Sequence, residues 1–258
     1  MVAIENKRLA RKELEQEKIK KEVEIARDVQ SMLIPRDLPN DSYFQVAATY
    51  LPHQSVGGDY YDVIRINEKD LIICIADVSG KGVPAAMIMS NFQASLRTIA
   101  RMTHKVDVII QDLNNHLNQN AAPDHFITCF LAYYNGDTRT LEYVNAGHNP
   151  PYLNIANNLK ELTEGCFMLG AFPKIPKINK GKVYIPDKTQ LFLYTDGITE
   201  TVNDGEEEFG EKRLQQFLLR SDEISLQLKQ ANLIVELDDF KGTQNYRDDL
   251  TMLSVNFL

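Results

Sequence analysis

The sequence predicts an α+β domain built from mainly antiparallel β-sheets covered by helices. Strand-like segments follow one another through short polar turns, such as residues 67–70 and 135–137, which is typical of β-hairpins. Segments with helical periodicity occur in pairs between these hairpins and do not alternate one-to-one with the strands. This order argues against a repeated βαβ unit and favours layers of helices on antiparallel sheets.

The predicted elements after residue 40 follow from periodicity and turn residues. The first helix after residue 40 has Pro84 in its first turn, where proline is tolerated, and continues with apolar residues at spacings of three and four. Strands are expected at residues 44–51, 60–66, 71–76, 126–134, 140–145, 152–155, 182–185, 190–195 and 250–257. Helices are expected at residues 85–99, 106–118, 211–219 and 225–237.

The first 34 residues are predicted to form one helix, because no Gly or Pro occurs between Ile4 and Leu33. Its heptad core positions form an apolar seam at Leu9, Ile19, Val23, Ala26 and Leu33. Lys12 and Gln16 interrupt this seam, so a solvated charged helix is one interpretation. We favour a coiled coil that dimerises or carries a signal, because the seam of so polar a helix needs a partner. Residues 1–38 are therefore expected to be a helical linker and residues 41–258 one domain.

Composition excludes several classes of protein. The chain has 258 residues, a hydrophobic content of 43% and a formal net charge of -8, which argues against a nucleic-acid-binding protein. The cysteines Cys74, Cys129 and Cys166 are widely spaced and show no CxxC pair, so we expect neither a zinc site nor a disulfide framework. The N-terminus is too charged for a signal peptide. We expect a cytoplasmic location, with the chain free or as the cytoplasmic part of a membrane sensor.

Four acidic turns lie at the ends of predicted strands. They contain Asp59, Asp77, Asp196 and Asp248, and antiparallel neighbours can bring such strand ends together. Taken singly, each turn has an ordinary explanation, since Asp and Gly are common turn residues. Taken together, several carboxylates without a His/Cys ligand set favour a hard cation such as Mg²⁺ or Mn²⁺.

A pair of such ions would explain why the carboxylates gather. Without metal they would repel one another and take up protons. Two ions roughly 3.5–4 Å apart would neutralise them, activate a water molecule and polarise a phosphoryl group.

Five motifs in a fixed order resemble those of the PPM metal-dependent serine/threonine phosphatases, in particular the bacterial SpoIIE/RsbU branch of sporulation and stress response. They are GGDYYD, ADVSGKG, NAGHNPP, YTDG and RDDLT. The preceding IARDVQSMLIP also resembles the helix and linker of that branch. The resemblance covers about residues 22–258 and implies an αββα fold, two central antiparallel sheets flanked by helices.

The resemblance also implies a site with two Mn²⁺ or Mg²⁺ ions. Asp77 would bridge both ions. Asp59 would bind one of them together with the backbone carbonyl of Val78, while Asp196 and Asp248 would bind the other. A water between the ions would attack a phosphoserine or phosphothreonine without a phospho-enzyme intermediate.

Other motif residues are assigned supporting roles. Asp62 and Asp249 are expected to support the metal ligands or to stabilise turns. Residues 51–56 contain no counterpart of the phosphate-binding arginine of the eukaryotic relatives. Lys81 and the backbone around Gly80 and Gly82 are the candidates for a phosphate contact. His148 has either a direct role or a purely structural one in its turn.

The expected function is hydrolysis of phosphoserine or phosphothreonine on a partner protein. The resemblance implies that this partner is a phosphorylated STAS-domain anti-sigma-factor antagonist. It also implies control by the N-terminal helix and an upstream sensor, and linked helices would favour a homodimer. The alternative is a pseudophosphatase that acts as a binding scaffold, which the presence of all four aspartates disfavours.

Overall fold

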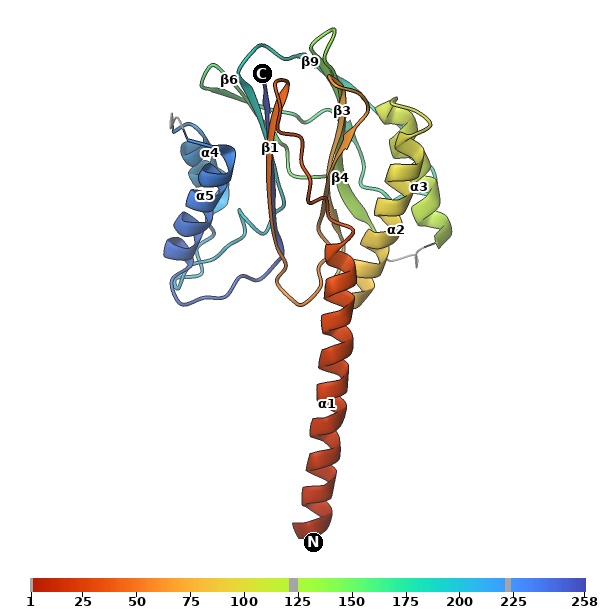
Figure 1. Ribbon diagram of the computed structural model, residues 1–258, viewed down its shortest axis with the longest axis vertical. Helices are drawn as coiled ribbons and strands as arrows, with labels where there is room; N and C mark the ends of the chain where they lie inside the picture. The colour runs from red at the N-terminus through yellow and green to blue at the C-terminus, as the bar shows by residue number, and fades with distance from the viewer. Residues whose placement is uncertain (1, 121–124, 221–223) are drawn as a thin grey trace.

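Two β-sheets stack face to face between two layers of helices, and a long helix projects from one end (Figure 1). The computed structural model describes residues 2–120, 125–220 and 224–258. This αββα arrangement confirms the predicted α+β fold, including its N-terminal helix.

The six-stranded sheet contains the first hairpin of the domain. Its strands, in chain order, are β2 (Tyr60–Arg65), β3 (Leu71–Val78), β4 (Ile127–Asn135), β5 (Thr140–Ala146), β8 (Gly165–Cys166) and β9 (Gly181–Tyr184). The order across the sheet is β2-β3-β4-β5-β8, and β9 also pairs with β5. All these pairs are antiparallel except β5 with β8, which is parallel.

The five-stranded sheet joins the two ends of the domain, because β1 and the last strand, β11, are neighbours. Its strands, in spatial order, are β1 (Phe44–Leu51), β11 (Leu250–Phe257), β10 (Thr189–Tyr194), β6 (Tyr152–Ile155) and β7 (Asn158–Glu161). Every pair in this sheet is antiparallel. The short strands β7 and β8 were not predicted, since neither has an apolar alternation that marks a strand.

Two pairs of helices cover the outer faces of the sheets. Helices α2 (Val83–Ala100) and α3 (Val106–Asn120) pack on the six-stranded sheet, and α5 (Leu226–Lys241) packs beside α4 (Gly210–Leu218) over the five-stranded sheet (Figure 1). The main hydrophobic core lies between the sheets and under α2 and α3, and a second core lies under α4 and α5. The domain is thus held by two separate apolar layers on either side of the five-stranded sheet.

Helix α1 (Val2–Ser31) extends away from the domain and touches it only near its C-terminal end, where it contacts α2 (Figure 1). The helix ends at Ser31, so Leu33 of the predicted seam lies beyond it. Val23 and Ala26 are partly covered, whereas Ile25 and Val29 remain exposed. Within the described residues, no helix combines the length and the hydrophobicity needed to cross a bilayer.

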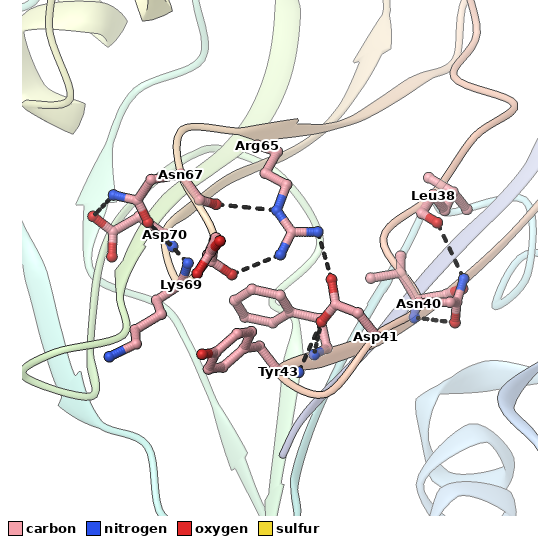
Figure 2. A network of polar contacts seen from close by, with 11 residues as sticks. Leu38, Asn40, Asp41, Tyr43, Arg65, Asn67, Lys69 and Asp70 are labelled. Carbon is pink, nitrogen blue, oxygen red and sulfur yellow. Dashed lines mark hydrogen bonds and ion pairs between the residues drawn. The ribbon is translucent and has the colours of Figure 1, made fainter.

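A polar network fastens the segment after α1 to the far end of the sandwich (Figure 2). The guanidinium of Arg65 donates to a carboxylate oxygen of Asp41 and to the carbonyls of Asn67 and Glu68. Asp41 in turn accepts from the backbone N–H groups at the start of β1. Because Arg65 ends β2, this network ties the linker to the sheet at the end opposite Asp59.

Candidate active site

The acidic turns meet at one end of the sandwich, where β2 and β11 begin and where β3 and β10 end. The pairing of Tyr60 with Ala76 places Asp59 beside Asp77 on neighbouring strands. The backbone N–H of Thr195 donates to the carbonyl of Thr251, which places the turn after β10 beside the start of β11. The structure therefore brings together acidic side chains from both sheets.

Asp59 is a buried carboxylate held by the opposite sheet. Its side chain is 1% exposed, and its Oδ2 accepts from the hydroxyls of Thr195 at 2.7 Å and Thr251 at 2.6 Å. Burial, followed by the charges of Asp77 and Asp249, raises the pKa of Asp59 well above its ordinary value, and the two threonine hydroxyls oppose this rise. A carboxylate so placed needs a positive partner to remain ionised at low cost.

Asp77 lies at the centre of the acidic cluster, which we define as Asp59, Asp77, Asp196, Asp248 and Asp249. It belongs to β3, because that strand continues through Val78 and pairs with residues 127–128 of β4. Burial, and then the charges of Asp196, Asp248 and Asp249, raise the pKa of Asp77 to about 7. A hydrogen bond with Asp59 works in the opposite direction. The pKa of Asp77, a residue of the six-stranded sheet, therefore depends on carboxylates at the strand ends of the five-stranded sheet.

Asp196 and Asp248 form the part of the cluster nearest the solvent. Burial and then the charge of Asp248 raise the pKa of Asp196, while the backbone N–H of Gly197 and the charge of Lys81 lower it. The Lys81 ammonium lies 2.6 Å from Oδ2 of Asp248, whose side chain is 35% exposed. This lysine is the cation that the structure places against the cluster.

Asp249 holds the loop that leads into β2. Its Oδ1 accepts from the backbone N–H of His53 at 2.7 Å, and its Oδ2 accepts from the N–H of Gly58 at 2.8 Å. Burial raises the pKa of Asp249, and these backbone donors oppose the rise. Both of its oxygens are thus occupied by backbone donors of the segment that leads to Asp59.

The backbone carbonyl of Val78 faces the loop before Asp59. A Cβ added to Gly58 would lie 2.8 Å from this carbonyl oxygen, so only glycine allows the two backbones to approach so closely. The predicted pair of donors, Asp59 and the Val78 carbonyl, is therefore close together.

His148 is buried behind the cluster. Its Nδ1 lies 2.8 Å from the Thr128 hydroxyl, and its Nε2 lies 3.1 Å from the Tyr194 carbonyl. Because a carbonyl can only accept, Nε2–H donates to Tyr194 and Nδ1 accepts from Thr128. Burial lowers the pKa of His148 to about 4, so the ring is neutral at pH 7 and links β4 to β10.

Asp62 has partners outside the cluster. It is fully buried in β2, and its two oxygens accept from Nε of Arg97 at 2.8 Å and from Nη2 at 2.9 Å. The Tyr60 hydroxyl also donates to it. These contacts hold α2 against β2. The described partners of the Asp62 side chain are thus Arg97 and Tyr60, and not the proposed metal ligands.

The residues around the cluster fit a hard cation in donor type and charge. All five acidic side chains and the Val78 carbonyl offer oxygen atoms, which Mg²⁺ and Mn²⁺ prefer. Burial, and then the charge of neighbouring carboxylates, raises the pKa values of Asp59, Asp77, Asp196 and Asp249, so a bound cation would favour their ionised forms. Within the described ranges, no three His, Cys, Asp or Glu side chains lie close enough together to hold an ion as they stand. Ion binding would therefore draw the carboxylates inward.

Sequence reasoning missed several residues that build the site. Thr195 and Thr251 lie inside the YTDG and RDDLT motifs, but their hydroxyls attracted no prediction. Gln30 is 5% exposed, donates from Nε2 to the Gly57 carbonyl at 2.7 Å and accepts from the Gly57 N–H at 3.1 Å. Gln30 lies inside the IARDVQSMLIP motif, but a glutamine in a polar helix does not indicate which residue it contacts, whereas threonines next to metal-site aspartates do.

Comparisons with known proteins agree with this geometry. The family model of Stage II sporulation protein E (SpoIIE) matches residues 67–258. The phosphoserine phosphatase RsbU of Bacillus subtilis is 30% identical over 187 residues, which is 72% of this chain and 55% of RsbU. The chain thus spans about half the length of that relative.

Solved structures show the same fold. The SiaA-PP2C domain of Pseudomonas aeruginosa superposes with a TM-score of 0.84 at 20% identity, covering 94% of this chain and 98% of that one. RsbX in complex with magnesium superposes with a TM-score of 0.65 at 18% identity, covering 86% and 99%. The chain therefore belongs to the SpoIIE family and has the PP2C-type phosphatase fold that its motifs predicted.

Proposed function

We propose that this chain is a metal-dependent protein phosphatase that hydrolyses phosphoserine or phosphothreonine on a partner protein. The observation that carries the proposal is the acidic cluster, in which carboxylates from four strand ends lie near enough to raise one another's pKa values. Membership of the SpoIIE family and the description of RsbU as a phosphoserine phosphatase support this reaction class. A pseudophosphatase is the weaker alternative, since none of the expected acidic residues is replaced.

Two Mn²⁺ or Mg²⁺ ions are proposed to occupy the cluster, with Asp77 between them. Asp59 and the Val78 carbonyl would hold one ion, and Asp196 and Asp248 the other. When bound, the ions would supply an activated water and polarise the phosphoryl group. The magnesium bound by RsbX supports this choice of cation.

The chain's own residues keep the donors in place. The Thr195 and Thr251 hydroxyls fix one oxygen of Asp59, so that its other oxygen is the one available to an ion. His148 ties β4 to β10 and thereby holds the strand that ends at Asp196. Side chains held by such outer contacts keep metal ligands oriented.

The substrate is proposed to be a phosphorylated STAS-domain protein that antagonises an anti-sigma factor. The SpoIIE/RsbU resemblance supports this substrate, and the similarity to the phosphoserine phosphatase RsbU supports a phosphoserine target. The net charge of -8 makes long-range attraction of an acidic phosphoprotein unfavourable. Recognition would therefore depend on local contacts near the site.

Residues 1–38 are proposed to be a regulatory helical linker that joins two copies and an upstream sensor to the domain of residues 41–258. Gln30 supports this role, because its two hydrogen bonds to Gly57 connect α1 with the loop before Asp59. Rotation of α1 would move Gly57 and the neighbouring Gly58, whose N–H donates a hydrogen bond to Asp249. Cys74, Cys129 and Cys166 are free thiols. A cytoplasmic location is proposed for the chain.

The reaction is tested by phosphate release from a phosphoserine-containing STAS-domain protein. We expect release to require Mn²⁺ or Mg²⁺, to stop with a chelator and to fall at least about a thousandfold in Asp77→Asn, since a ligand shared by both ions is lost. Release that is insensitive to the chelator and to Asp77→Asn would overturn the metal mechanism.

The regulatory linker is tested by Gln30→Ala, with Gln16→Ala on the exposed part of α1 as the matched control. We expect Gln30→Ala to change the Mn²⁺ affinity or the basal rate, and Gln16→Ala to leave both unchanged. Identical behaviour of the two variants would show that α1 is not coupled to the site through Gln30.

A further inference from the structure

Lys81 already supplies a positive charge to the acidic cluster. Its Nζ lies 2.6 Å from Oδ2 of Asp248 and also donates to the Arg247 carbonyl at 2.6 Å. Its charge also reaches Asp196, whose pKa it lowers. The lysine therefore contacts or influences both side chains that are proposed to hold the second ion.

The loop that carries Lys81 lies at the surface and is not packed against the core. Gly80 and Gly82 flank it with φ angles of +96° and +71°, a region that favours glycine. A Cβ added to Gly80 would have no atom within 4 Å, so this side of the loop is open. The Lys81 side chain is 47% exposed. Its ammonium can leave Asp248 for solvent without any repacking of the core.

We propose that Lys81 is a resident cation of the metal-free site, which the second ion must displace from Asp248. The inference rests on the proposed function, because it takes Asp248 as a metal ligand. An ammonium 2.6 Å from Oδ2 of Asp248 and a divalent ion bound to the same carboxylate would repel each other, and each would neutralise charge that the other needs. Lys81 therefore stabilises the metal-free protein and weakens metal binding by the same amount.

The size of the effect follows from the exposure of the pair. Ion pairs between partly exposed side chains each contribute little to stability. Their contribution corresponds to roughly a 1.5- to 5-fold change in the equilibrium constant for unfolding or binding. Removing the ammonium should therefore tighten binding of one ion by about this factor. Metal affinity that depends on Lys81 would distinguish this role from a contact to phosphate alone, which leaves metal affinity unchanged.

The test is calorimetric titration of Mn²⁺ into the full chain, comparing wild type with Lys81→Gln, Lys81→Arg and Lys69→Gln. Lys69 is a matched control, because it pairs with Asp137 at 3.2 Å, is 46% exposed and lies on the turn between β2 and β3, away from the cluster. We expect Lys81→Gln to bind one Mn²⁺ about 1.5- to 5-fold more tightly. Lys81→Arg and Lys69→Gln should retain wild-type affinity.

Thermal unfolding gives a second measurement. Without metal, the melting temperature of Lys81→Gln should lie below that of wild type, and the increase caused by Mn²⁺ should be larger. Equal or weaker Mn²⁺ binding by Lys81→Gln, when wild type binds Mn²⁺, would overturn the role of Lys81 and leave the proposed function standing. Absence of Mn²⁺ binding by wild type would overturn both.

Discussion

Replacing Asp77 by Asn should make the metal-free protein more stable while abolishing its response to metal. Asp77 lies among four other carboxylates, and burial, followed by the charges of Asp196, Asp248 and Asp249, raises its pKa to about 7. Asn has nearly the same shape as protonated Asp but never ionises. The substitution therefore removes the cost of the charge without leaving a cavity.

The sign and size of this effect depend on pH. In the unfolded chain Asp77 ionises near pH 4, whereas in the folded chain it ionises near pH 7, so the folded state holds the extra proton between these values. The stability of wild type must then fall as pH rises from about 4 to about 7, and stay at the lower level above. The full difference corresponds to at most about 4 kcal/mol at pH 8.

Urea unfolding in the presence of a chelator measures this difference. We expect Asp77→Asn to equal wild type near pH 4 and to exceed it by up to about 4 kcal/mol at pH 8. Asp137→Asn, whose side chain is 78% exposed, serves as the control and should show no such pH dependence. An Asp77→Asn protein that is less stable than wild type at pH 8, or that is still stabilised by Mn²⁺, would refute the reasoning.

Four further substitutions test the surroundings of the cluster. Gly57→Ala would place a Cβ 2.1 Å from Oδ2 of Asp249, so we expect a loss of about 1–3 kcal/mol in urea unfolding; an unchanged midpoint would contradict this packing. Arg97→Met leaves the buried Asp62 charge without its partner and should cost about 3 kcal/mol or more. Asp62→Asn instead removes the buried charge itself and should cost less, about 2 kcal/mol. If Asp62→Asn destabilised the protein more than Arg97→Met in urea unfolding, the argument from the buried Asp62 charge would be contradicted. His148 is neutral in the fold and takes up a proton on unfolding below about pH 6.5, so wild type should lose up to about 3 kcal/mol relative to His148→Gln between pH 6.5 and 4. Parallel stability profiles of these two proteins would refute the assignment.

The sequence predicted the architecture because its signals are local. The strand of residues 71–76 is continuously apolar, and short polar turns determine how it pairs. Its true end at Val78 was missed by two residues, since pairing with β4 carries the strand through Asp77. The parallel pairing of β5 with β8 was also missed, because two residues carry no periodicity.

The acidic residues were predictable, but their individual partners were not. Asp59 and Asp77 stand at strand ends in recognisable motifs, and the strand order brings them together. Asp62 belongs to the same motif as Asp59, yet its partner Arg97 lies 35 residues away on α2. Such a contact depends on how a helix packs on a sheet, which one-dimensional patterns do not encode.

Long-range polar contacts explain the remaining differences. Gln30 and Gly57 are 27 residues apart, and Lys81 and Asp248 are further apart still. In each pair the residue types are ordinary for their local structure. Only the folded arrangement shows that both contacts converge on the acidic cluster.

The most direct test of the central claim, that buried carboxylate charge at this site is neutralised by metal ions, is the proton release that accompanies Mn²⁺ binding. Calorimetric titration at pH 7 in two buffers of different ionisation enthalpy measures this number. Because the pKa of Asp77 is about 7, roughly half of the Asp77 side chains are protonated at pH 7, and we predict that Mn²⁺ binding releases at least this fraction of a proton per chain. Asp77→Asn, which is expected to lose its response to metal, should show neither Mn²⁺ binding nor this proton release. Mn²⁺ binding without proton release, or no binding at all, would contradict the claim.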